Sequence, residues 1–368
     1  GIYRLIKLTE RYNKVSMPEV TVTDMRDELR SGNTSVISGR LYQSMKEQLG
    51  AGKQVMLFLN RRGYSTFISC RECGYVAKCP TCGLSLTYHK KNGSAVCHYC
   101  GYQTAAISSC PDCGSRYVKY FGSGTEKVEE TVSAMFPEYS TERLDLDSVR
   151  KKGELERRLR AFQKGKTDIL IGTQLIAKGL DFKNVGLVGI ISADVALNIP
   201  DFRSPERALQ LIIQAAGRAG RGDEKGKVVI QTYSPEHYAV AFAAAQDYEG
   251  FYKTEIQLRK YMGYPPFSDM FQILFTSADQ QEALRGAQSW HDRLMKALPE
   301  EEKGNLFRPQ EAYMSKIKEK YRYSMLIKCP KGRRRGYSDM INSIREEDKK
   351  DRKKNYTAVT DINPYSFE

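Results

Sequence analysis

Short apolar runs alternate with amphipathic stretches along the first 240 residues. The apolar runs at 55–59, 118–121, 168–171, 185–191 and 228–232 predict strands. A helical rhythm at 41–49, 152–164 and 204–216, and in a stretch that ends at 135, predicts helices. Strands that alternate with helices are typical of a parallel sheet covered on both faces. The pattern therefore predicts an α/β domain.

The pattern changes character from residue 248 onward. A helical stretch that ends near 262 is followed by Gly263-Tyr264-Pro265-Pro266-Phe267, a strand at 270–275, a helix at 279–298 and a strand at 324–328. This order predicts a small α+β domain. It carries two basic clusters, at 331–335 and 349–354. Both a solvated face and a contact with a polyanion remain open for them.

Eight of the nine cysteines lie between residues 70 and 113, as four CxxC pairs that are each followed by glycine. Two thiolates on a tight turn are typical of a zinc knuckle, and the glycine supplies the backbone freedom that the turn needs. Four pairs can form two tetrahedral sites with four thiolate ligands each. The candidate zinc ligands are Cys70, Cys73, Cys79, Cys82, Cys97, Cys100, Cys110 and Cys113.

The segment between the second and third pairs predicts how the cysteines are shared. It alternates as a strand over 84–89 and turns at 91–93, as a β-hairpin does. A hairpin with a knuckle at each end is a zinc ribbon, so the pairs at 79/82 and 97/100 should share one ion and the outer pairs the other. An interleaved pairing and disulfides stay open, although CxxC pairs without a secretory signal favour metal. His89 and His98 could be ligands of a variant site, but we expect ordinary polar side chains.

Length and charge narrow the class of protein. The 368 residues suit two to three domains, and the net charge of +14 favours a polyanionic partner, nucleic acid first, over a merely solvated basic surface. The sequence shows neither a membrane-spanning run nor a signal peptide, and reduced paired cysteines predict a cytoplasmic protein. Because the chain begins with Gly1 rather than Met, we expect a fragment.

Several strings together carry a family resemblance. Residues 214–221 (QAAGRAGR) resemble the QxxGRxGR motif of superfamily 2 helicases, and 168–182 (DILIGTQLIAKGLDF) resemble their motif V. With the four knuckles, NRRG at 60–63, PDFR at 200–203 and YPPF at 264–267, the chain is similar to the bacterial replication-restart helicases of that superfamily. The similarity covers nearly the whole chain and thins past about residue 331.

The resemblance implies a fold and its domains. It predicts an α/β chain made of a RecA-like second helicase lobe (1–69 and 114–240), an inserted binuclear zinc-ribbon module (70–113) and a small α+β domain for DNA or partner binding (241–368). The resemblance also implies candidate site residues. The arginine fingers would be Arg218 and Arg221, with Gln214 lining the same ATP cleft; Gly179 and Asp181 would couple DNA contact to the nucleotide; and DNA phosphates would meet Gly124, Thr125, Gly172, Thr173 and Gln174.

The sequence departs from the family in two places and lacks a part of it. Leu180 stands where the family usually has His, and Ser192-Ala193-Asp194 stands where it usually has Asp-Ala-Asp. Neither a Walker A loop nor a DEAH-type box is found, since Gly50-Ala51-Gly52-Lys53 is preceded by a helix and followed by a strand, the reverse of a P-loop. We therefore expect the carboxyl-terminal portion of an ATP-dependent 3′→5′ DNA helicase, inactive alone.

The resemblance also implies cofactors and partners. Two Zn²⁺ ions belong to this chain, and ATP with Mg²⁺ to the intact enzyme. The expected partners are branched and single-stranded DNA, single-stranded-DNA-binding protein and other primosome proteins, with no membrane, in the nucleoid-associated cytoplasm of a bacterium. A stand-alone DNA- and protein-binding module without ATPase activity is the alternative, and a zinc ribbon on a degraded helicase scaffold is a third reading. The complete GRAGR and GTQ strings argue against that third reading.

Overall fold

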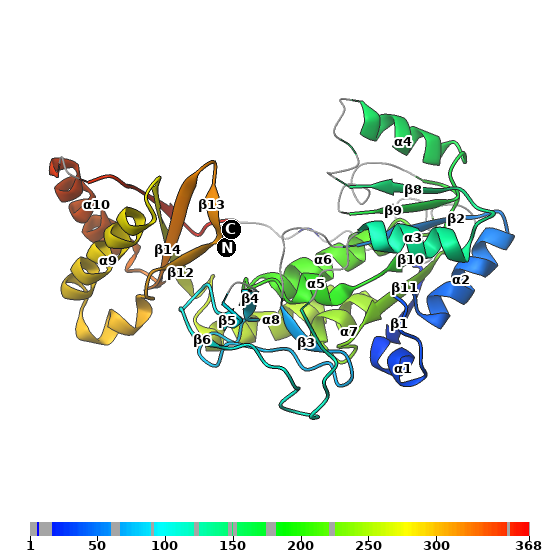
Figure 1. Cartoon of the computed structure of the whole chain (residues 1–368), viewed down its shortest axis with the longest axis horizontal. Coiled ribbons are helices and arrows are strands. Elements are labelled where there is room, and N and C mark those ends of the chain that lie inside the picture. Colours follow the sequence, from blue (N-terminus) through cyan, green and yellow to red (C-terminus); the bar gives the residue numbers. More distant parts are fainter. Residues whose placement is uncertain are drawn as a thin grey trace.

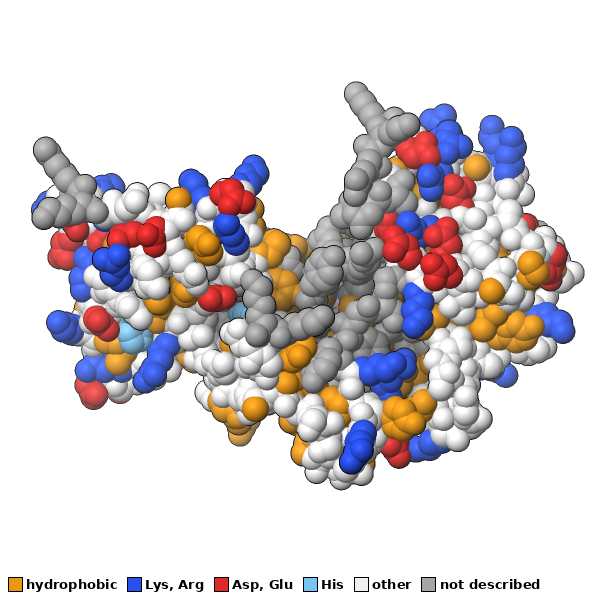
Figure 2. All heavy atoms as spheres, viewed as in Figure 1, with side chains coloured by type: hydrophobic (Ala, Val, Ile, Leu, Met, Phe, Trp, Pro, Cys, Tyr) orange, Lys and Arg blue, Asp and Glu red, His pale blue; other side chains and the backbone are white. Residues whose placement is uncertain are grey.

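The computed structural model describes residue 6 and residues 17–59, 67–89, 92–120, 125–145, 149, 153–173, 182–220, 225–351 and 354–367. Figure 1 shows a large sheet at one end of the molecule, a small sheet at the other, and a cysteine-rich segment along one side between them. The surface is hollowed between the two ends, and basic and acidic side chains are interspersed on the face that Figure 2 shows. None of the described helices is long and apolar enough to cross a bilayer.

The large sheet is parallel. We call this sheet, together with the helices that pack on it, the sheet lobe. Its six strands run in the order β1 (Glu19–Asp24), β11 (Lys227–Thr232), β10 (Val185–Ile190), β2 (Gln54–Phe58), β9 (Ile169–Gly172) and β8 (Thr141–Leu144). One face packs on α2 (Gly39–Gly50) and α3 (Thr125–Met135). The other packs on α4 (Glu154–Gln163), α5 (Ala193–Leu197), α6 (Ser204–Ala216) and α7 (Tyr238–Ala245), while α1 (Met25–Arg30) follows β1.

Burial on both faces explains the near-continuous apolar strands. All five residues of β2 are buried, with Val55 and Leu57 facing the α2 side and Met56 and Phe58 facing the α6 side. A strand covered on both faces needs apolar side chains at every position, whereas a half-exposed strand alternates. The predicted parallel α/β sheet is confirmed.

Two strands differ from the prediction. The run at 118–121 forms β7 (Val118–Tyr120), which pairs antiparallel with β3 (Ile68–Cys70) and stands outside the large sheet. One edge of the large sheet is instead formed by β8, a short Thr-Glu-Arg-Leu segment in which only Leu144 is buried. An edge strand with one buried side chain leaves almost no hydrophobic signal, so the pattern did not reveal it.

The segment from Phe67 to Tyr120, which we call the cysteine-rich module, contains little regular structure. Its hairpin is formed by β4 (Thr87–His89) and β5 (Ser94–Val96), as predicted, and β6 (Gln103–Ala105) adds a third antiparallel strand that was not predicted. Each of these strands has three residues. Strands this short cannot bury a core of their own.

The helix α8 (Tyr248–Met262) leads to the terminal domain, residues 264–367, which has the predicted α+β character. Its antiparallel sheet runs in the order β13 (Gln310–Ile317), β14 (Lys320–Pro330), β12 (Ser268–Ser277) and β15 (Thr357–Ile362). One face packs on α9 (Gln280–Ala297) and α10 (Arg334–Lys350), with the 3₁₀ helix η1 (Glu300–Asn305) beside them. The predicted domain bounds remain a proposal, since α8 lies past residue 240 and still packs on the sheet lobe through Phe251.

The buried carboxylate of Asp348 joins both helices of the terminal domain. Burial alone would raise its pKa, but hydrogen bonds from Trp290 (2.7 Å), Tyr356 (2.7 Å) and Arg293 (2.5 Å) outweigh burial and hold the pKa below its usual value. Because the folded-state pKa is depressed, the stabilisation is present above about pH 4 and is lost as the pH falls through the folded-state value.

We predict that Asp348→Ala lowers the free energy of unfolding of the terminal domain by about 3 kcal/mol, because it leaves the Arg293 guanidinium and two further donors without their shared acceptor. Urea unfolding followed by Trp290 fluorescence measures this. The matched control is Glu347→Ala, since Glu347 is 65% exposed and should cost under about 0.5 kcal/mol. Equal losses in the two variants would contradict the assignment.

Candidate functional site

The four CxxC segments adopt the same turn. In each, the N–H of the glycine after the pair donates to the carbonyl of the first cysteine, at 2.8–3.1 Å, and the first cysteine's own N–H donates to the residue after the glycine, at 2.7–2.8 Å. All four glycines have positive φ, between 68° and 81°. This conformation is disfavoured for other residues, which explains a glycine after every pair.

The sulfurs gather into two clusters. Cys70, Cys73, Cys110 and Cys113 form the outer cluster, and Cys79, Cys82, Cys97 and Cys100 form the inner cluster. Within each, the four sulfurs lie within 4.8 Å of one another, which is the grouping that the hairpin predicts. The interleaved grouping does not occur among them.

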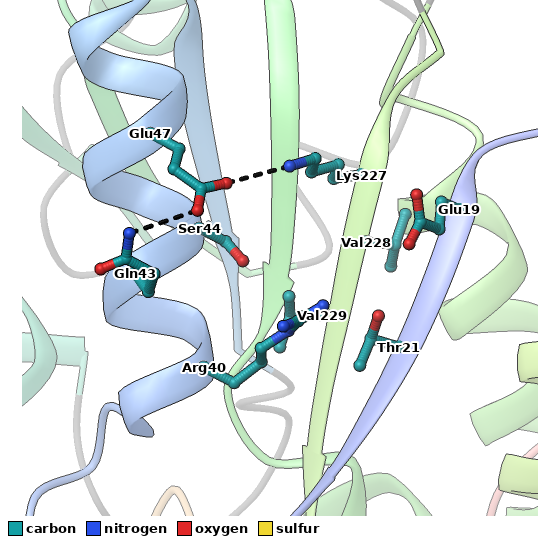
Figure 3. A pocket seen from close by; sticks show the side chains of 9 residues that line it. All are labelled: Glu19, Thr21, Arg40, Gln43, Ser44, Glu47, Lys227, Val228 and Val229. Atoms are coloured by element: carbon teal, nitrogen blue, oxygen red, sulfur yellow. Dashed lines mark hydrogen bonds and ion pairs between the residues drawn. The ribbon is translucent and has the colours of Figure 1, made fainter.

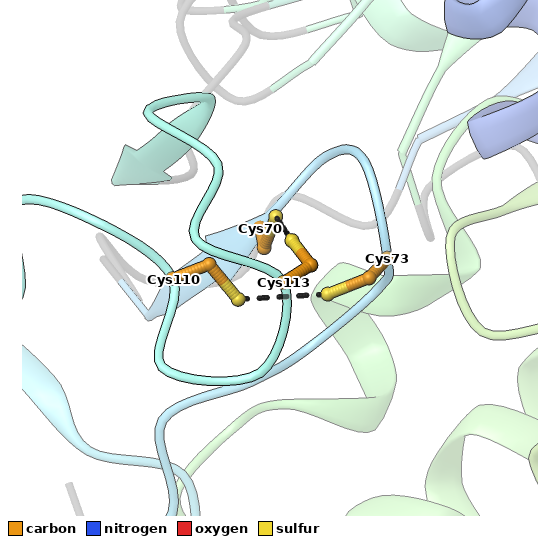
Figure 4. Close-up of side chains that lie close together, drawn as sticks. All are labelled: Cys70, Cys73, Cys110 and Cys113. Atoms are coloured by element: carbon orange, nitrogen blue, oxygen red, sulfur yellow. Dashed lines mark hydrogen bonds between the residues drawn. The ribbon is translucent and has the colours of Figure 1, made fainter.

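The distances fit a metal and exclude disulfides. Figure 4 shows the outer cluster, with Cys70 Sγ 3.7 Å from Cys113 Sγ and Cys73 Sγ 3.5 Å from Cys110 Sγ. A tetrahedral zinc with Zn–S bonds of about 2.3 Å has sulfurs about 3.8 Å apart, whereas a disulfide bond is about 2.05 Å long. All of these cysteines are free. Four convergent soft donors therefore fit zinc in each cluster.

Hydrogen bonding between thiols polarises the inner cluster. The thiol of Cys82 lowers the pKa of Cys97, and the same bond together with burial raises the pKa of Cys82. His89 and His98 belong to neither sulfur cluster. Their Nε2 atoms lie 3.0 Å apart, and burial lowers the pKa of His98 to about 4, so this ring is neutral at pH 7.

Two of the knuckle glycines lie where the cysteine-rich module packs closely against its neighbours. A Cβ on Gly74 would lie 2.3 Å from the carbonyl oxygen of Tyr233 in the sheet lobe, and one on Gly101 would lie 1.9 Å from the amide of Gln310 in the terminal domain. By contrast, Gly114 has no heavy atom within 4 Å of that position. The module thus touches the sheet lobe through one knuckle and the terminal domain through another.

The outer cluster is tied to the sheet lobe by two arginines of α1. Arg26 donates to the carbonyl of Cys73 at 3.3 Å and also pairs with Asp24 at 2.7 Å. Arg30 donates to the carbonyl of Glu72 at 3.3 Å. No local pattern predicts these contacts, because the paired residues lie more than 40 positions apart.

Predicted DNA-contacting residues lie at the carboxyl edge of the large sheet. Gly172 ends β9, and the N–H of Thr173 donates to the carbonyl of Leu144 at 3.3 Å. Thr125 begins α3, but it is fully buried and its hydroxyl donates to Asp145 at 2.5 Å. A phosphate at this turn would therefore meet backbone N–H groups rather than the threonine hydroxyl. Gly124 and Gln174 lie outside the described residues.

The end of α6 and the turn after it, which carry Gln214 and Arg218, lie at the opposite edge. Gln214 is exposed on the outer side of α6, and Arg218 follows the end of that helix, half-buried. The N–H of Gly220 donates to the carbonyl of Val185, the first residue of β10, which places the GRAGR turn at the amino edge of the sheet. Arg221, Gly179 and Asp181 lie outside the described residues, as do Leu180 and the NRRG string.

The structure shows the hydrogen bonding of the Ser192-Ala193-Asp194 segment, where the family usually has Asp-Ala-Asp. Asp194 is buried, and it accepts hydrogen bonds from the Thr232 hydroxyl at 3.0 Å and the Tyr233 N–H at 3.1 Å, so it joins α5 to β11. Burial raises its pKa to about 6. The buried hydroxyl of Ser192 has no hydrogen-bond partner among the described residues.

A cavity of about 200 Å³ lies between α2 and the β1–β11 edge of the sheet (Figure 3). Glu47 of α2 and Lys227 of β11 close one end with an ion pair of 3.0 Å. Thr21 and Val229 lie on strands, opposite Arg40 and Ser44 of the helix. None of the predicted zinc-ligating, nucleotide-contacting or DNA-contacting residues lines this cavity.

Family models match three parts of the chain. The helicase conserved C-terminal domain matches residues 116–223, the cysteine-rich region of PriA DNA helicase matches 79–104, and the primosomal protein N C-terminal domain matches 260–365. Together they cover the sheet lobe's second half, the inner cluster and the terminal domain.

Curated relatives match nearly the whole chain. Replication restart protein PriA of Bacillus subtilis is 41% identical over 366 residues, which are 99% of this chain and 45% of that protein. The protein of the same name from Synechocystis is 39% identical over 329 residues, which are 88% of this chain and 39% of that protein. The chain spans less than half the length of either relative.

Solved structures are more distant. RecG bound to a three-way DNA junction matches with a TM-score of 0.35 and 13% identity, over 68% of this chain and 22% of that one. Yeast Dbp5 bound to RNA and ADP BeF3 matches with a TM-score of 0.33 and 14% identity, over 69% of this chain and 48% of that one. At these values the similarity carries no functional argument.

We predict that Gly74→Ala destabilises the docked module by about 2 kcal/mol more than Gly114→Ala does. Both glycines have positive φ, +81° and +71°, so the backbone strain of about 1–2 kcal/mol is shared, and only Gly74 faces a backbone atom at contact distance. Thermal unfolding of the two variants at equal metal loading measures the difference. Equal midpoints would show that Gly74 does not touch the lobe in solution.

Proposed function

This chain belongs to the PriA family of replication restart proteins, and we propose that it supplies the second lobe, the zinc module and the terminal domain of an ATP-dependent DNA helicase that acts at stalled forks. The observation that carries the proposal is the GRAGR turn at the end of α6 in a parallel-sheet lobe, combined with two tetrathiol clusters in the same chain. In the intact enzyme, a separate lobe would hold the nucleotide. We propose that the enzyme works in the bacterial cytoplasm, at the nucleoid.

The proposed chemistry divides between the two edges of the sheet. ATP and Mg²⁺ would lie against the amino edge, where Arg218 and Arg221 stabilise charge on the transferring phosphoryl group and Gln214 lines the cleft. DNA would cross the carboxyl edge, where Gly172, Thr173 and the start of α3 offer backbone N–H groups to phosphates. Gly124, Gln174, Gly179 and Asp181 would complete the DNA contact and its link to the nucleotide.

Strand polarity and protein partners follow from the family. We propose 3′→5′ translocation, in which contacts to sugar and phosphate rather than to bases allow movement along any sequence. The exposed basic run at 331–335, which leads into the first residues of α10, supports an additional contact with a polyanion. Single-stranded-DNA-binding protein and other primosome proteins are the proposed protein partners.

The first prediction of this proposal concerns metal. The purified chain should contain two zinc ions, and Cys113→Ala should contain one, because each cluster needs all four thiolates for a closed structural site. Cys329→Ala is the matched control, since Cys329 is buried in the terminal domain away from both clusters and its loss should leave two ions. Elemental analysis by mass spectrometry decides it, and a wild-type content of one ion or none would refute the two-site assignment.

The second prediction concerns DNA. Binding should prefer forks over plain duplex, tolerate changes of sequence and weaken steeply as salt rises, because phosphate neutralisation releases counterions. We expect dissociation constants on the order of micromolar at physiological salt, as for non-specific complexes. Fluorescence anisotropy titrations with fork, duplex and single-stranded oligonucleotides at several salt concentrations test it. Tight binding to one particular sequence, or affinity that salt leaves unchanged, would rule out this mode.

A further inference from the structure

Several contacts of the terminal domain end on the two knuckles of the inner cluster. The hydroxyl of Tyr264 donates to the carbonyl of Cys82 at 3.2 Å. The ring of His98, next to Cys97, meets the carbonyl of Glu311 on β13 at 3.1 Å through Nδ1. The Gln310 amide fills the space that a side chain on Gly101 would take. Both knuckles therefore face the terminal domain.

An aromatic cluster extends these contacts to the sheet lobe. Phe202, in the PDFR string just before α6, stacks on Tyr264 of the YPPF string, with ring centroids 4.8 Å apart and planes 9° apart. Tyr99, inside the third knuckle, is 2% exposed and meets the edge of Phe367 at 4.8 Å. The ammonium of Lys328 lies 4.1 Å from the centroid of Tyr264. These rings join the sheet lobe, the inner cluster and the terminal domain at one point.

The last residues of the chain reinforce the same junction. Buried Asp201 accepts hydrogen bonds from Arg203 at 3.0 Å and from Arg207 at 3.1 Å. The remaining N–H groups of these arginines donate to successive carbonyls, those of Pro364 (2.6 Å, from Arg203) and Tyr365 (from Arg207). Asp201, Arg203 and Arg207 therefore hold the segment that follows β15 against the start of α6.

The outer cluster faces the other way. Its first knuckle contacts α1 and the carbonyl of Tyr233 in the sheet lobe, as described above. Its last knuckle is turned to solvent, with Cys113 exposed and open space around Gly114. The contacts described for the terminal domain thus involve the inner cluster and not the outer one.

We propose that the inner cluster, once it holds its metal, fixes the terminal domain on the sheet lobe, and that loss of this metal alone frees the terminal domain to move. The inference rests on the proposed metal binding. A metal bound by Cys82 would fix the second knuckle, whose Cys82 carbonyl accepts a hydrogen bond from the Tyr264 hydroxyl. A metal bound by Cys97 would fix the third knuckle, which carries His98 and Tyr99. Without the metal, these turns lose the constraint that presents their contact groups.

The single tryptophan provides a built-in probe. Trp290 is fully buried in the core of the terminal domain, so its time-resolved fluorescence anisotropy reports how that domain tumbles. In the two-zinc protein we expect one slow correlation time, that of the whole chain. In Cys97→Ala, which removes an inner ligand, the correlation time should fall by about threefold, toward that of a domain of about one hundred residues.

The matched control is Cys113→Ala, which removes an outer ligand and should leave the slow tumbling unchanged. A third variant, Tyr264→Leu, should retain two zinc ions and still tumble faster, because it removes both the hydrogen bond to Cys82 and the stack on Phe202. The Tyr264→Leu variant decides the matter if Cys97→Ala perturbs Trp290 emission itself.

Three results would overturn the inference. They are slow tumbling in Cys97→Ala with one zinc bound, slow tumbling in Tyr264→Leu, and a correlation time in Cys113→Ala that falls as far as in Cys97→Ala. The zinc content, measured on the same samples, separates this outcome from failure of the proposed function. A wild-type chain without zinc refutes the metal centres, whereas a chain with two zinc ions and an unaltered correlation time in the variants refutes only the coupling.

Discussion

The convergence of four thiol sulfurs at each of two points is the interaction on which the middle of this molecule depends. The strands of the cysteine-rich module have three residues each, and its apolar side chains join a cluster that is completed by Phe202, Tyr264, Met270 and Leu326 from the two neighbouring domains. A segment with so little core of its own has few other sources of stability. Metal held by these clusters would replace the missing core and orient the backbone groups that the neighbours contact.

The features that could be predicted from the sequence are those with local causes. Ligand spacing, a glycine that needs positive φ, and a hairpin turn are all written within a few residues, so the grouping of the cysteine sulfurs could be read directly. The central strands of the sheet lobe could also be predicted, because burial on both faces requires continuous apolar runs such as 55–58. The roles predicted for Arg218 and Gly172 came from the resemblance to helicases, since no local pattern contains them.

What the sequence did not reveal depends on residues far apart in the chain. The edge strand β8 has one buried side chain, and β6 has none. The ties of Arg26 to Cys73 and of His98 to Glu311 connect positions 47 and 213 residues apart. Thr125 shows the reverse case: the resemblance predicts a DNA-phosphate contact at this residue, and the fold buries its hydroxyl against Asp145.

The order of these segments along the chain has a consequence for biosynthesis. Gly101 meets Gln310, a residue that is made 209 positions later. At about 5–20 residues per second, the module waits on the order of 10–40 s on the ribosome before its partner surface emerges. During that interval the thiols are uncovered on the side that the terminal domain later occupies. A metal ion that binds during this interval would reach the inner cluster before the terminal domain packs against its knuckles.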